Sequence, residues 1–378
     1  DSTDKTIVLG NDINGWLSTQ NVEQVTMRLV GKIFHSTNFN LNLSGDLNLK
    51  AGRLDLLNIK LNNYRWNKDD AFFLPDNYEI SGGIVDGVIS LRERTDHIRG
   101  FDIDGNVSIQ NGVIHLTDKN LSFEDIQINA DIANWNCILR NANARFNGSP
   151  VEVFGRIDNI LAPRLDLELH SSLFDLSRFV QSFTTKPRLQ IQGNSTVRFY
   201  LTNTFEQPHI TGELESPFIR AGALKFRRTR ADVWYADSIF KLSKLSTNLQ
   251  GIDLNASGKL NLTKQKQAIQ VFVEGNGNFF QLVTPPFRGL ENSTTSFSIW
   301  GDGKPDSITG NFNLNIDHVE ASDSSFQFNG DVVFQKNRLV LRAGSESHSF
   351  DGQFSFDFFD KKSPYRINVT GFHHLIQS

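Results

Sequence analysis

Apolar and polar residues alternate one by one along most of the chain. The alternation is clearest in residues 41–49, 165–169 and 312–316, where Asn, Ser, Asp or Glu follows most Leu, Ile or Phe residues. Because successive side chains of a strand point to opposite faces, this pattern predicts strands with one apolar and one polar face. Gly, Asn and Asp interrupt the runs at short intervals, which is typical of turns between antiparallel strands. We therefore predict an all-β fold built from an antiparallel sheet.

Two short stretches show helical spacing instead. The first places apolar residues at Leu173, Leu176, Val180 and Phe183. Ser171 or Ser172 is the expected N-cap of this helix. We expect the helix to pack its apolar stripe across the open side of the sheet as a plug. Residues 278–283 have a similar pattern, and the Pro-Pro pair that follows would end that helix.

The chain contains internal repeats. Residues 121–157 align without gaps on residues 224–260, and six of the 37 pairs are identical while apolar positions and glycines coincide. Residues 39–49 match residues 252–262 at seven of 11 positions. We predict units of about 100 residues, each made of several antiparallel strands followed by a short amphipathic helix.

These repeats predict four parts. An N-terminal β repeat with a divergent start covers 1–100, repeats that each end in a helix cover 101–183 and 184–288, and a partial C-terminal repeat covers 289–378. Stacked repeats bury their apolar faces on one another, so we expect one continuous structural unit cut from a longer protein. A sheet of this length must curl to cover its apolar face, which predicts an elongated, taco-like groove.

The apolar side of each strand is expected to line this groove and to contact acyl chains. The predicted lining residues are Leu41, Leu43, Leu47, Leu49, Val107, Ile109, Ile126, Ile128, Leu165, Leu167, Leu169, Val271, Val273, Phe312, Leu314, Ile316, Phe354 and Phe356.

Composition sharpens this interpretation. Phe occurs 31 times, against five Trp and five Tyr, so the aromatic surface is mostly without a polar group. The net charge of −4 argues against nucleic acid as a partner. Cys137 is the single cysteine, which excludes an intrachain disulfide. No run of about 18 apolar residues is present, so the sequence predicts no membrane-spanning helix.

Candidate chemistry is sparse. The nine histidines are scattered apart from His373 and His374, and no nucleophile motif or acid–base pair stands out. We therefore predict no catalytic residues, no metal, no cofactor and no enzymatic activity. The only basic cluster comprises Arg227, Arg228 and Arg230, and we expect it to contact anionic headgroups at the rim of the groove.

Three segments resemble a known family. They are GDLNLKAGRLDLLNIKL (45–61), GNVSIQNGVIHL (105–116) and PRLDLELHSSLFDLSRFV (163–180). They are similar to the AsmA-like family (AsmA, TamB and YhdP), within the repeating β-groove class of lipid-transfer proteins, and the resemblance covers roughly residues 22–378. It implies an elongated β-groove in the Gram-negative periplasm and a role in outer-membrane biogenesis. It also implies an N-terminal helix in the inner membrane, which lies outside this sequence and is expected in the full-length parent.

Together these features predict a segment that binds and conducts lipids between the inner and outer membranes. The expected partners are phospholipid or another acyl lipid, the membranes through the missing anchor, and an outer-membrane protein. The alternative is a structural or adhesive β-solenoid of the cell surface. Solenoid coils repeat every 20–30 residues or so, and a period near 100 favours the groove.

Overall fold

The structure is a computed structural model in which strands dominate. It describes residues 10–21, 23–33, 36–66, 78–93, 100–116, 121–160, 162–183, 191–204, 206–222, 224–263, 267–278, 293–304, 307–317, 325–335, 338–345, 350–357 and 365–370. These residues form 23 strands and one short helix. Each pairing with a defined register is antiparallel, so the predicted all-β antiparallel fold is confirmed.

The chain divides into two compact units. The first comprises Asp1–Ser171 and Leu201–Glu206, and the second comprises Ser172–Tyr200 and Gln207–Ser378. Strands β10 and β12 contain residues of both units. The predicted division into four repeats stays a prediction.

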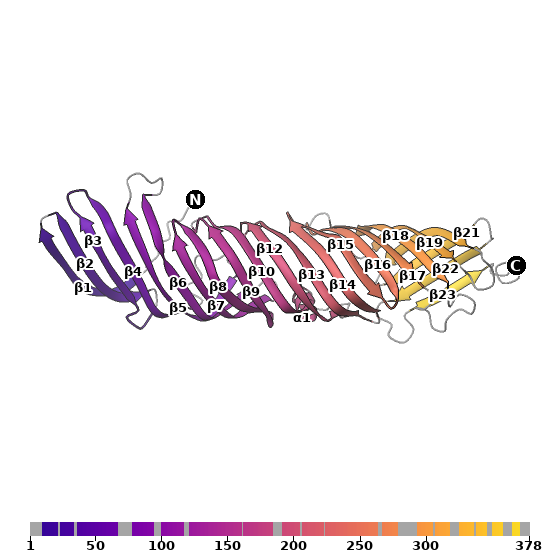
Figure 1. The fold of residues 1–378 in the computed structure, drawn as a ribbon, viewed down its shortest axis with the longest axis horizontal. Coiled ribbons are helices and arrows are strands. Elements are labelled where there is room, and N and C mark those ends of the chain that lie inside the picture. The colour runs from indigo at the N-terminus through magenta and orange to yellow at the C-terminus, as the bar shows by residue number, and fades with distance from the viewer. Residues whose placement is uncertain are drawn as a thin grey trace. The chain divides into compact units, whose positions relative to one another are not determined.

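The strands of the first unit follow one another as a meander (Figure 1). They are β1 (Gly10–Asn21), β2 (Gln24–Ile33), β3 (Leu41–Asn48), β4 (Arg53–Arg65), β5 (Tyr78–Glu93), β6 (Phe101–Leu116), β7 (Leu121–Ala133), β8 (Asn136–Phe146), β9 (Ser149–Asp158) and β10 (Arg164–Asp175). From β1 to β10, each strand pairs with the next strand in the sequence.

The second unit contains the helix and the remaining strands. They are α1 (Leu176–Phe183), β11 (Ile191–Gln192), β12 (Asn194–Asn203), β13 (Pro208–Ala221), β14 (Leu224–Ala236), β15 (Ile239–Leu249), β16 (Ile252–Asn261), β17 (Ala268–Gly277), β18 (Thr294–Lys304), β19 (Ser307–Asp317), β20 (Phe326–Gln335), β21 (Arg338–Ser345), β22 (Phe350–Asp357) and β23 (Tyr365–Thr370). Strands β13 to β23 again pair in sequence order (Figure 1).

Strand register gathers the apolar residues of the first unit on one face. Directly opposed residues of an antiparallel pair share a face. Following these pairs from strand to strand links Leu43, Ile59, Ile89 and, through Gly105, Ile132. We call this the apolar face of the first unit; it comprises Val25, Met27, Leu29, Leu41, Leu43, Leu47, Leu57, Ile59, Leu61, Val85, Ile89, Leu91, Val107, Ile109, Ile126, Ile128, Ile132, Cys137, Leu139, Val153, Ile157, Leu165, Leu167 and Leu169.

The second unit has an apolar face built in the same way. Val273 lies opposite Ile299, and Ile299 lies opposite Phe312. The apolar face of the second unit comprises Leu214, Leu224, Phe226, Val233, Leu242, Leu245, Leu249, Ile252, Leu254, Leu260, Ile269, Val271, Val273, Phe297, Ile299, Ile308, Phe312, Leu314, Ile316, Phe328, Val332, Phe334, Leu339, Leu341 and Phe354. In each unit, therefore, alternation along single strands adds up to a surface that extends over many strands.

Two groups of strands have the same layout. Strands β7, β8 and β9 have the lengths of β14, β15 and β16, and each begins 103 residues earlier in the chain. Register shifts between Glu124 and Gln127, Asn129 and Ala130, and Leu139 and Ala142 recur between Arg227 and Arg230, Asp232 and Val233, and Leu242 and Leu245. The left-handed backbone of Asp125 and Asn147 (φ 50° and 46°) likewise recurs at Arg228 and Gln250 (φ 51° and 49°).

Glycines bring neighbouring strands close together on the apolar face. A Cβ atom added to Gly105 would collide with the carbonyl oxygen of Val88, and one added to Gly310 would collide with that of Trp300. Both glycines sit between larger residues of the apolar face in their own strands. The neighbouring backbone therefore approaches on the apolar side, which indicates that the sheet bends toward this face at both positions.

We predict that Gly105→Ala destabilises the protein by about 1–3 kcal/mol, because the added methyl group forces the backbone of β5 away. Gly82→Ala is the matched control on β5, since a Cβ atom there would meet nothing within 4 Å. Urea unfolding followed by circular dichroism measures both variants. Equal unfolding midpoints for the two variants would contradict the close approach at Gly105.

Candidate functional site

Sixteen of the 18 predicted lining residues lie on the two apolar faces. Ten lie on the apolar face of the first unit: Leu41, Leu43, Leu47, Val107, Ile109, Ile126, Ile128, Leu165, Leu167 and Leu169. Six lie on that of the second unit: Val271, Val273, Phe312, Leu314, Ile316 and Phe354. Phe356 shares their register through its pairing with Leu339, and its side chain lies outside the described part of the chain.

Leu49 is placed differently from its prediction. It follows the last residue of β3, and 56% of its surface is exposed. Its backbone N–H donates to the carbonyl oxygen of Glu23, 2.7 Å away, so Leu49 belongs to the connection that leaves the sheet. The alternation therefore continues in the sequence for one position beyond the strand.

Strict alternation also overlooks several members of the apolar faces. Strands β4 and β5 contain neighbouring apolar pairs such as Leu56–Leu57 and Val88–Ile89, which place one residue on each face. Ile59 and Ile89, which lie directly opposite each other, were not among the predicted residues for this reason. Turn spacing and strand length are the sequence signals that could have identified these two strands.

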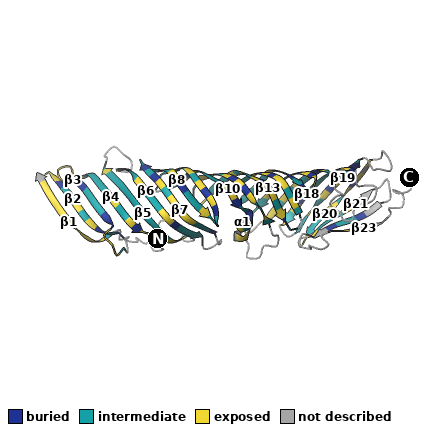
Figure 2. Cartoon of the chain, turned by 60° about the horizontal axis from the view of Figure 1, so that its bottom comes forward, coloured by how far each residue is buried: buried dark blue, intermediate teal, exposed yellow. Residues whose placement is uncertain are grey.

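Much of the apolar face of each unit remains partly open. Leu41, Ile126, Leu165, Phe312 and Ile316 are buried, with exposures of 5–6%. Most of the other described lining residues, including Leu43, Ile128 and Leu314, are only half-buried. Figure 2 shows how buried, intermediate and exposed positions follow one another along single strands. The interior of a packed β-sandwich buries its inner residues more completely, so these faces retain apolar surface that a ligand can contact.

A row of hydroxyl groups interrupts the apolar face of the second unit. Ser216 lies opposite Thr229, and the hydroxyl oxygens of Thr229 and Thr247 are 2.8 Å apart. The Ser216 hydroxyl donates to the carbonyl oxygen of Asn194 at 2.7 Å, and that of Thr247 donates to the carbonyl oxygen of Arg227 at 3.2 Å. These buried hydroxyls already form hydrogen bonds within the protein. Covering them with an apolar ligand therefore adds little to the free-energy cost of binding.

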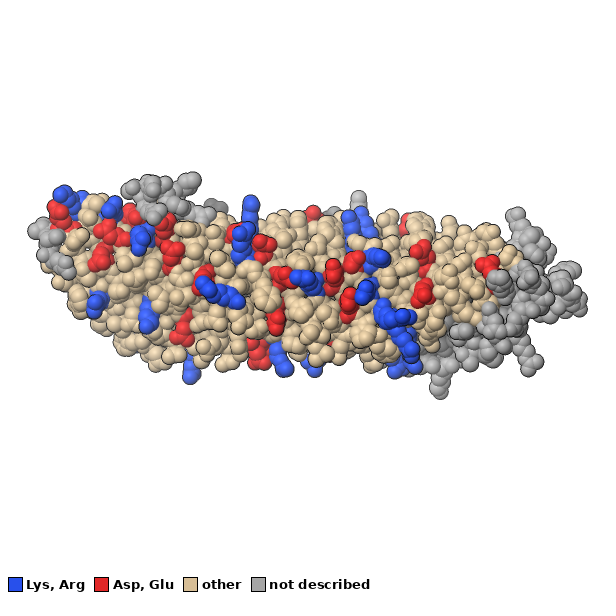
Figure 3. Space-filling model, in the orientation of Figure 1, with Lys and Arg blue, Asp and Glu red and all other residues tan. Residues whose placement is uncertain are grey.

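In each unit the opposite face of the sheet carries charged and amide side chains, together with exposed apolar ones such as Phe154, Phe272 and Trp300. In the first unit the Arg156 guanidinium lies 3.3 Å from the carboxylate of Asp158 and 3.4 Å from that of Asp166. In the second unit Ser246 donates to Asn255 at 3.0 Å. Acidic and basic side chains are interspersed on the surface drawn in Figure 3. A mixed surface of this kind favours the solubility of a sheet that has one apolar face.

The helix begins later than its sequence pattern predicts. Leu173 belongs to β10 and is 55% exposed, whereas α1 starts at Leu176. The carboxylate of Asp175 accepts hydrogen bonds from the backbone N–H groups of Ser177 and Arg178, at 2.9 and 3.2 Å, so Asp175 is the N-cap. The prediction of Ser171 or Ser172 was wrong because strand β10 continues through both residues.

Part of the apolar stripe of α1 is packed inward. Leu176, the first residue of α1, is buried, and Phe174, near the end of β10, is buried too; the Phe174 and Phe179 rings pack with their centroids 5.3 Å apart. The Leu176 N–H donates to the carbonyl oxygen of Gly193 at 3.1 Å, which fixes the start of the helix beside β11. The side chains of Val180 and Phe183, and most of the second predicted helix (278–283), lie outside the described residues.

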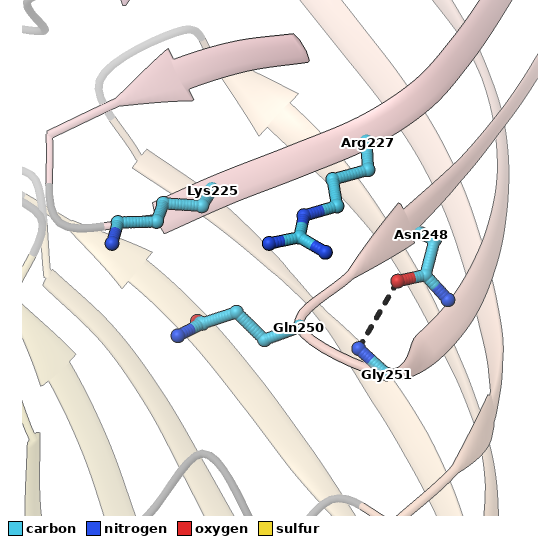
Figure 4. Close-up of a pocket in the computed structure, with 5 residues that line it drawn as sticks. All are labelled: Lys225, Arg227, Asn248, Gln250 and Gly251. Atoms are coloured by element: carbon cyan, nitrogen blue, oxygen red, sulfur yellow. Dashed lines mark hydrogen bonds between the residues drawn. The ribbon is translucent and has the colours of Figure 1, made fainter. Parts of the chain in front are cut away.

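The basic cluster does not act as one group. Arg230 pairs with Glu215 at 3.1 Å, and Arg228 occupies the bulge of β14 with φ 51°. Arg227 lines an open pocket of about 320 Å³ together with Lys225, Asn248, Gln250 and Gly251 (Figure 4). Sequence reasoning missed Lys225 because Phe226 separates it from the arginines, although the alternation places Lys225 and Arg227 on the same side of the strand.

Cys137 belongs to the apolar face of the first unit, between Ile132 and Ile157. Burial, and to a lesser extent the Asp131 carboxylate, raises the pKa of its thiol. Both effects disfavour the thiolate, which is the reactive form, so the thiol is suited to a structural role.

Searches of protein-family models, of curated proteins and of solved structures found no match to this chain. In the described residues, no helix is long and apolar enough to cross a membrane. Within the same residues, no three His, Cys, Asp or Glu side chains are grouped so that they could hold a metal ion.

We predict that Cys137 reacts more slowly with iodoacetamide than a free cysteine does at the same pH, because a raised pKa lowers the thiolate fraction. Asp131→Asn should move the midpoint of the rate–pH profile to lower pH, since it removes a charge that opposes ionisation. Asp46→Asn, on β3, is the control and should leave the profile unchanged. Identical profiles for wild type and Asp131→Asn would contradict the role of Asp131.

Proposed function

We propose that the chain binds acyl lipids on its apolar faces and conducts them along the apolar face of each unit. The observation that carries this proposal is the partly exposed apolar face of each unit, formed by register across consecutive strands. Contiguous apolar surface exposed on a soluble protein is typical of an interaction site. The charged and amide side chains of the opposite face favour solubility without requiring the apolar face to be sealed.

The energetics of lipid transfer agree with a surface of this kind. Moving one sixteen-carbon chain into water costs about 12 kcal/mol, from about 0.8 kcal/mol per CH₂ group. A lipid that crosses an aqueous space therefore needs continuous apolar cover. A face lined by Leu, Ile, Val and Phe at similar density offers nearly equal binding energy at successive positions, so a chain slides without a large barrier.

We also propose that the chain is assembled from repeats of about 100 residues. The support is the shared lengths, bulges and left-handed positions of β7–β9 and β14–β16 at an offset of 103 residues. Each added repeat lengthens the apolar face, because its strands continue the register of the preceding repeat. A short amphipathic helix in each repeat is part of this proposal, with α1 as the described example.

The resemblance to the AsmA-like family supports a more specific assignment. On that basis the chain is a periplasmic segment that carries phospholipid between the inner and outer membranes and contributes to outer-membrane biogenesis. The full-length parent would be anchored in the inner membrane, with an outer-membrane protein as a further partner. The proposed function requires no nucleic acid, no cofactor and no catalysis.

We predict that a photoreactive amino acid captures lipid only from the apolar side. Ile128 and Asn129 are neighbours in β7 on opposite faces, the first half-buried and the second exposed. Leu314 and Asn313 form the equivalent pair in β19. After delipidation and incubation with a radiolabelled phospholipid, benzoylphenylalanine at positions 128 and 314 should form lipid adducts on irradiation.

The neighbours at positions 129 and 313 are the matched controls and should form few adducts. Equal capture at both members of each pair, or no capture at any position while circular dichroism shows a folded protein, would contradict the proposed lipid-binding faces.

A further inference from the structure

The second unit has an open, basic pocket at the strand ends, beside the turn between β15 and β16. Lys225 and Arg227 come from the first residues of β14, and Gln250 and Gly251 form the turn between β15 and β16. In Figure 4 the side chains of Lys225, Arg227 and Gln250 extend into the same space. All three end in N–H donors, and none of the five lining residues is acidic, so the pocket is suited to an anion.

The two cations of the pocket are not neutralised by ion pairs in the described part of the chain. Arg230, further along β14, is paired with Glu215 at 3.1 Å, whereas neither Lys225 nor Arg227 has such a partner. The carboxylate of Asp253, opposite Asn248 in the ladder, keeps its charge; it accepts a hydrogen bond from the Asn248 side-chain amide at 2.8 Å and forms no ion pair with either cation among the described residues. The charge of Lys225 and Arg227 is therefore available to a ligand.

The corresponding hairpins of the first unit show that the fold does not need these charges. The same bulge and turn occur 103 residues earlier, where Ser122 and Glu124 replace Lys225 and Arg227. There, the side-chain oxygen of Asn147 accepts a hydrogen bond from the Ser122 N–H at 2.7 Å. This bond joins the turn between β8 and β9 to the start of β7, so the Asn147 side-chain oxygen is already engaged within the protein. Gln250, at the corresponding position, makes no such bond within the described residues, and its amide remains available.

Apolar and cationic residues alternate at this end of β14. Leu224 and Phe226 pack on a cluster of Leu249, Ile252 and Leu254, and Lys225 and Arg227 project to the other side of the same strand. A ligand that contacts both sides has an apolar tail on one face of the sheet and an anionic head on the other, and it crosses between them at the strand ends. The planar guanidinium of Arg227 matches the geometry of phosphate oxygens, and Lys225 adds a mobile point charge.

We propose that this pocket binds the phosphate group of a phospholipid whose acyl chains lie on the apolar face of the second unit. The inference rests on the proposed lipid function and adds the chemical class of the headgroup. It assigns the recognition of phosphate to Lys225, Arg227 and the Gln250 amide. The ion-paired Arg230 is not part of this group.

The test uses substitutions that the chain itself carries at the corresponding positions. The pocket variant is Lys225→Ser with Arg227→Glu, which introduces the residues of the equivalent bulge in the first unit. The control variant, Lys244→Ser with Lys259→Glu, makes the same change in net charge with exposed lysines of β15 and β16 that do not line the pocket. Circular dichroism establishes that both variants fold.

Three soluble probes are titrated into the full chain by calorimetry, the two acyl probes at concentrations too low for them to aggregate. They are dihexanoyl phosphatidylglycerol, dihexanoylglycerol, which lacks phosphate, and glycerol 3-phosphate, which lacks acyl chains. We expect wild type and the control variant to bind the phospholipid about tenfold or more tightly than dihexanoylglycerol. The pocket variant should bind the phospholipid no more tightly than dihexanoylglycerol, because the carboxylate introduced by Arg227→Glu repels the phosphate that Arg227 would attract.

Two results would overturn the pocket while leaving the proposed function intact. One is equal binding of the phospholipid and dihexanoylglycerol by wild type, and the other is unchanged phospholipid affinity in the pocket variant. Binding of glycerol 3-phosphate as tightly as the phospholipid would assign the pocket to a free phosphate compound and overturn the lipid assignment. If wild type bound neither acyl ligand, the proposed function would fail, and the pocket proposal would fall with it.

Discussion

Antiparallel register is the constraint on which the rest of the structure depends. Side chains alternate with a period of two, so a slip of one residue in any pairing would turn the apolar set of that strand to the polar side. The strands avoid this even where they are irregular. Leu139 lies opposite Gly155 before the bulge in β8, and Ala142 lies opposite Val153 after it, so the apolar face continues across the bulge.

This constraint produces an amphipathic sheet, and its apolar side must be shielded from water by contact with other apolar groups. Glycines such as Gly105 and Gly310 let the backbone of the next strand approach on that side, which bends the sheet toward its own apolar residues. Bending reduces the exposed area without sealing it, because residues such as Leu43 and Leu314 stay half-buried. The acyl chain that we propose as the ligand suits such a surface, since it needs apolar contact along its length and no directional bonds.

The fold class and the composition of the apolar faces could be predicted from the sequence because both follow from alternation. Leu165, Leu167 and Leu169 occupy the face that the pattern predicts. Features that depend on pairing partners could not be predicted. The start of α1 at Leu176 depends on how far β10 remains in the sheet, and the role of Lys225 depends on the turn of a neighbouring hairpin. Ile59 and Ile89 lie in strands with adjacent apolar residues, where the period of two is obscured.

A crystal structure of the chain prepared with a phospholipid tests the central claim most directly, because it locates the acyl chains on one face or the other. The account predicts tubular acyl density against the apolar face of the first unit, over Ile109, Ile128 and Leu167, with none on the opposite face around Asn129. Apolar side chains that meet one another across a closed, lipid-free interior would contradict it, as would lipid bound only on the polar face.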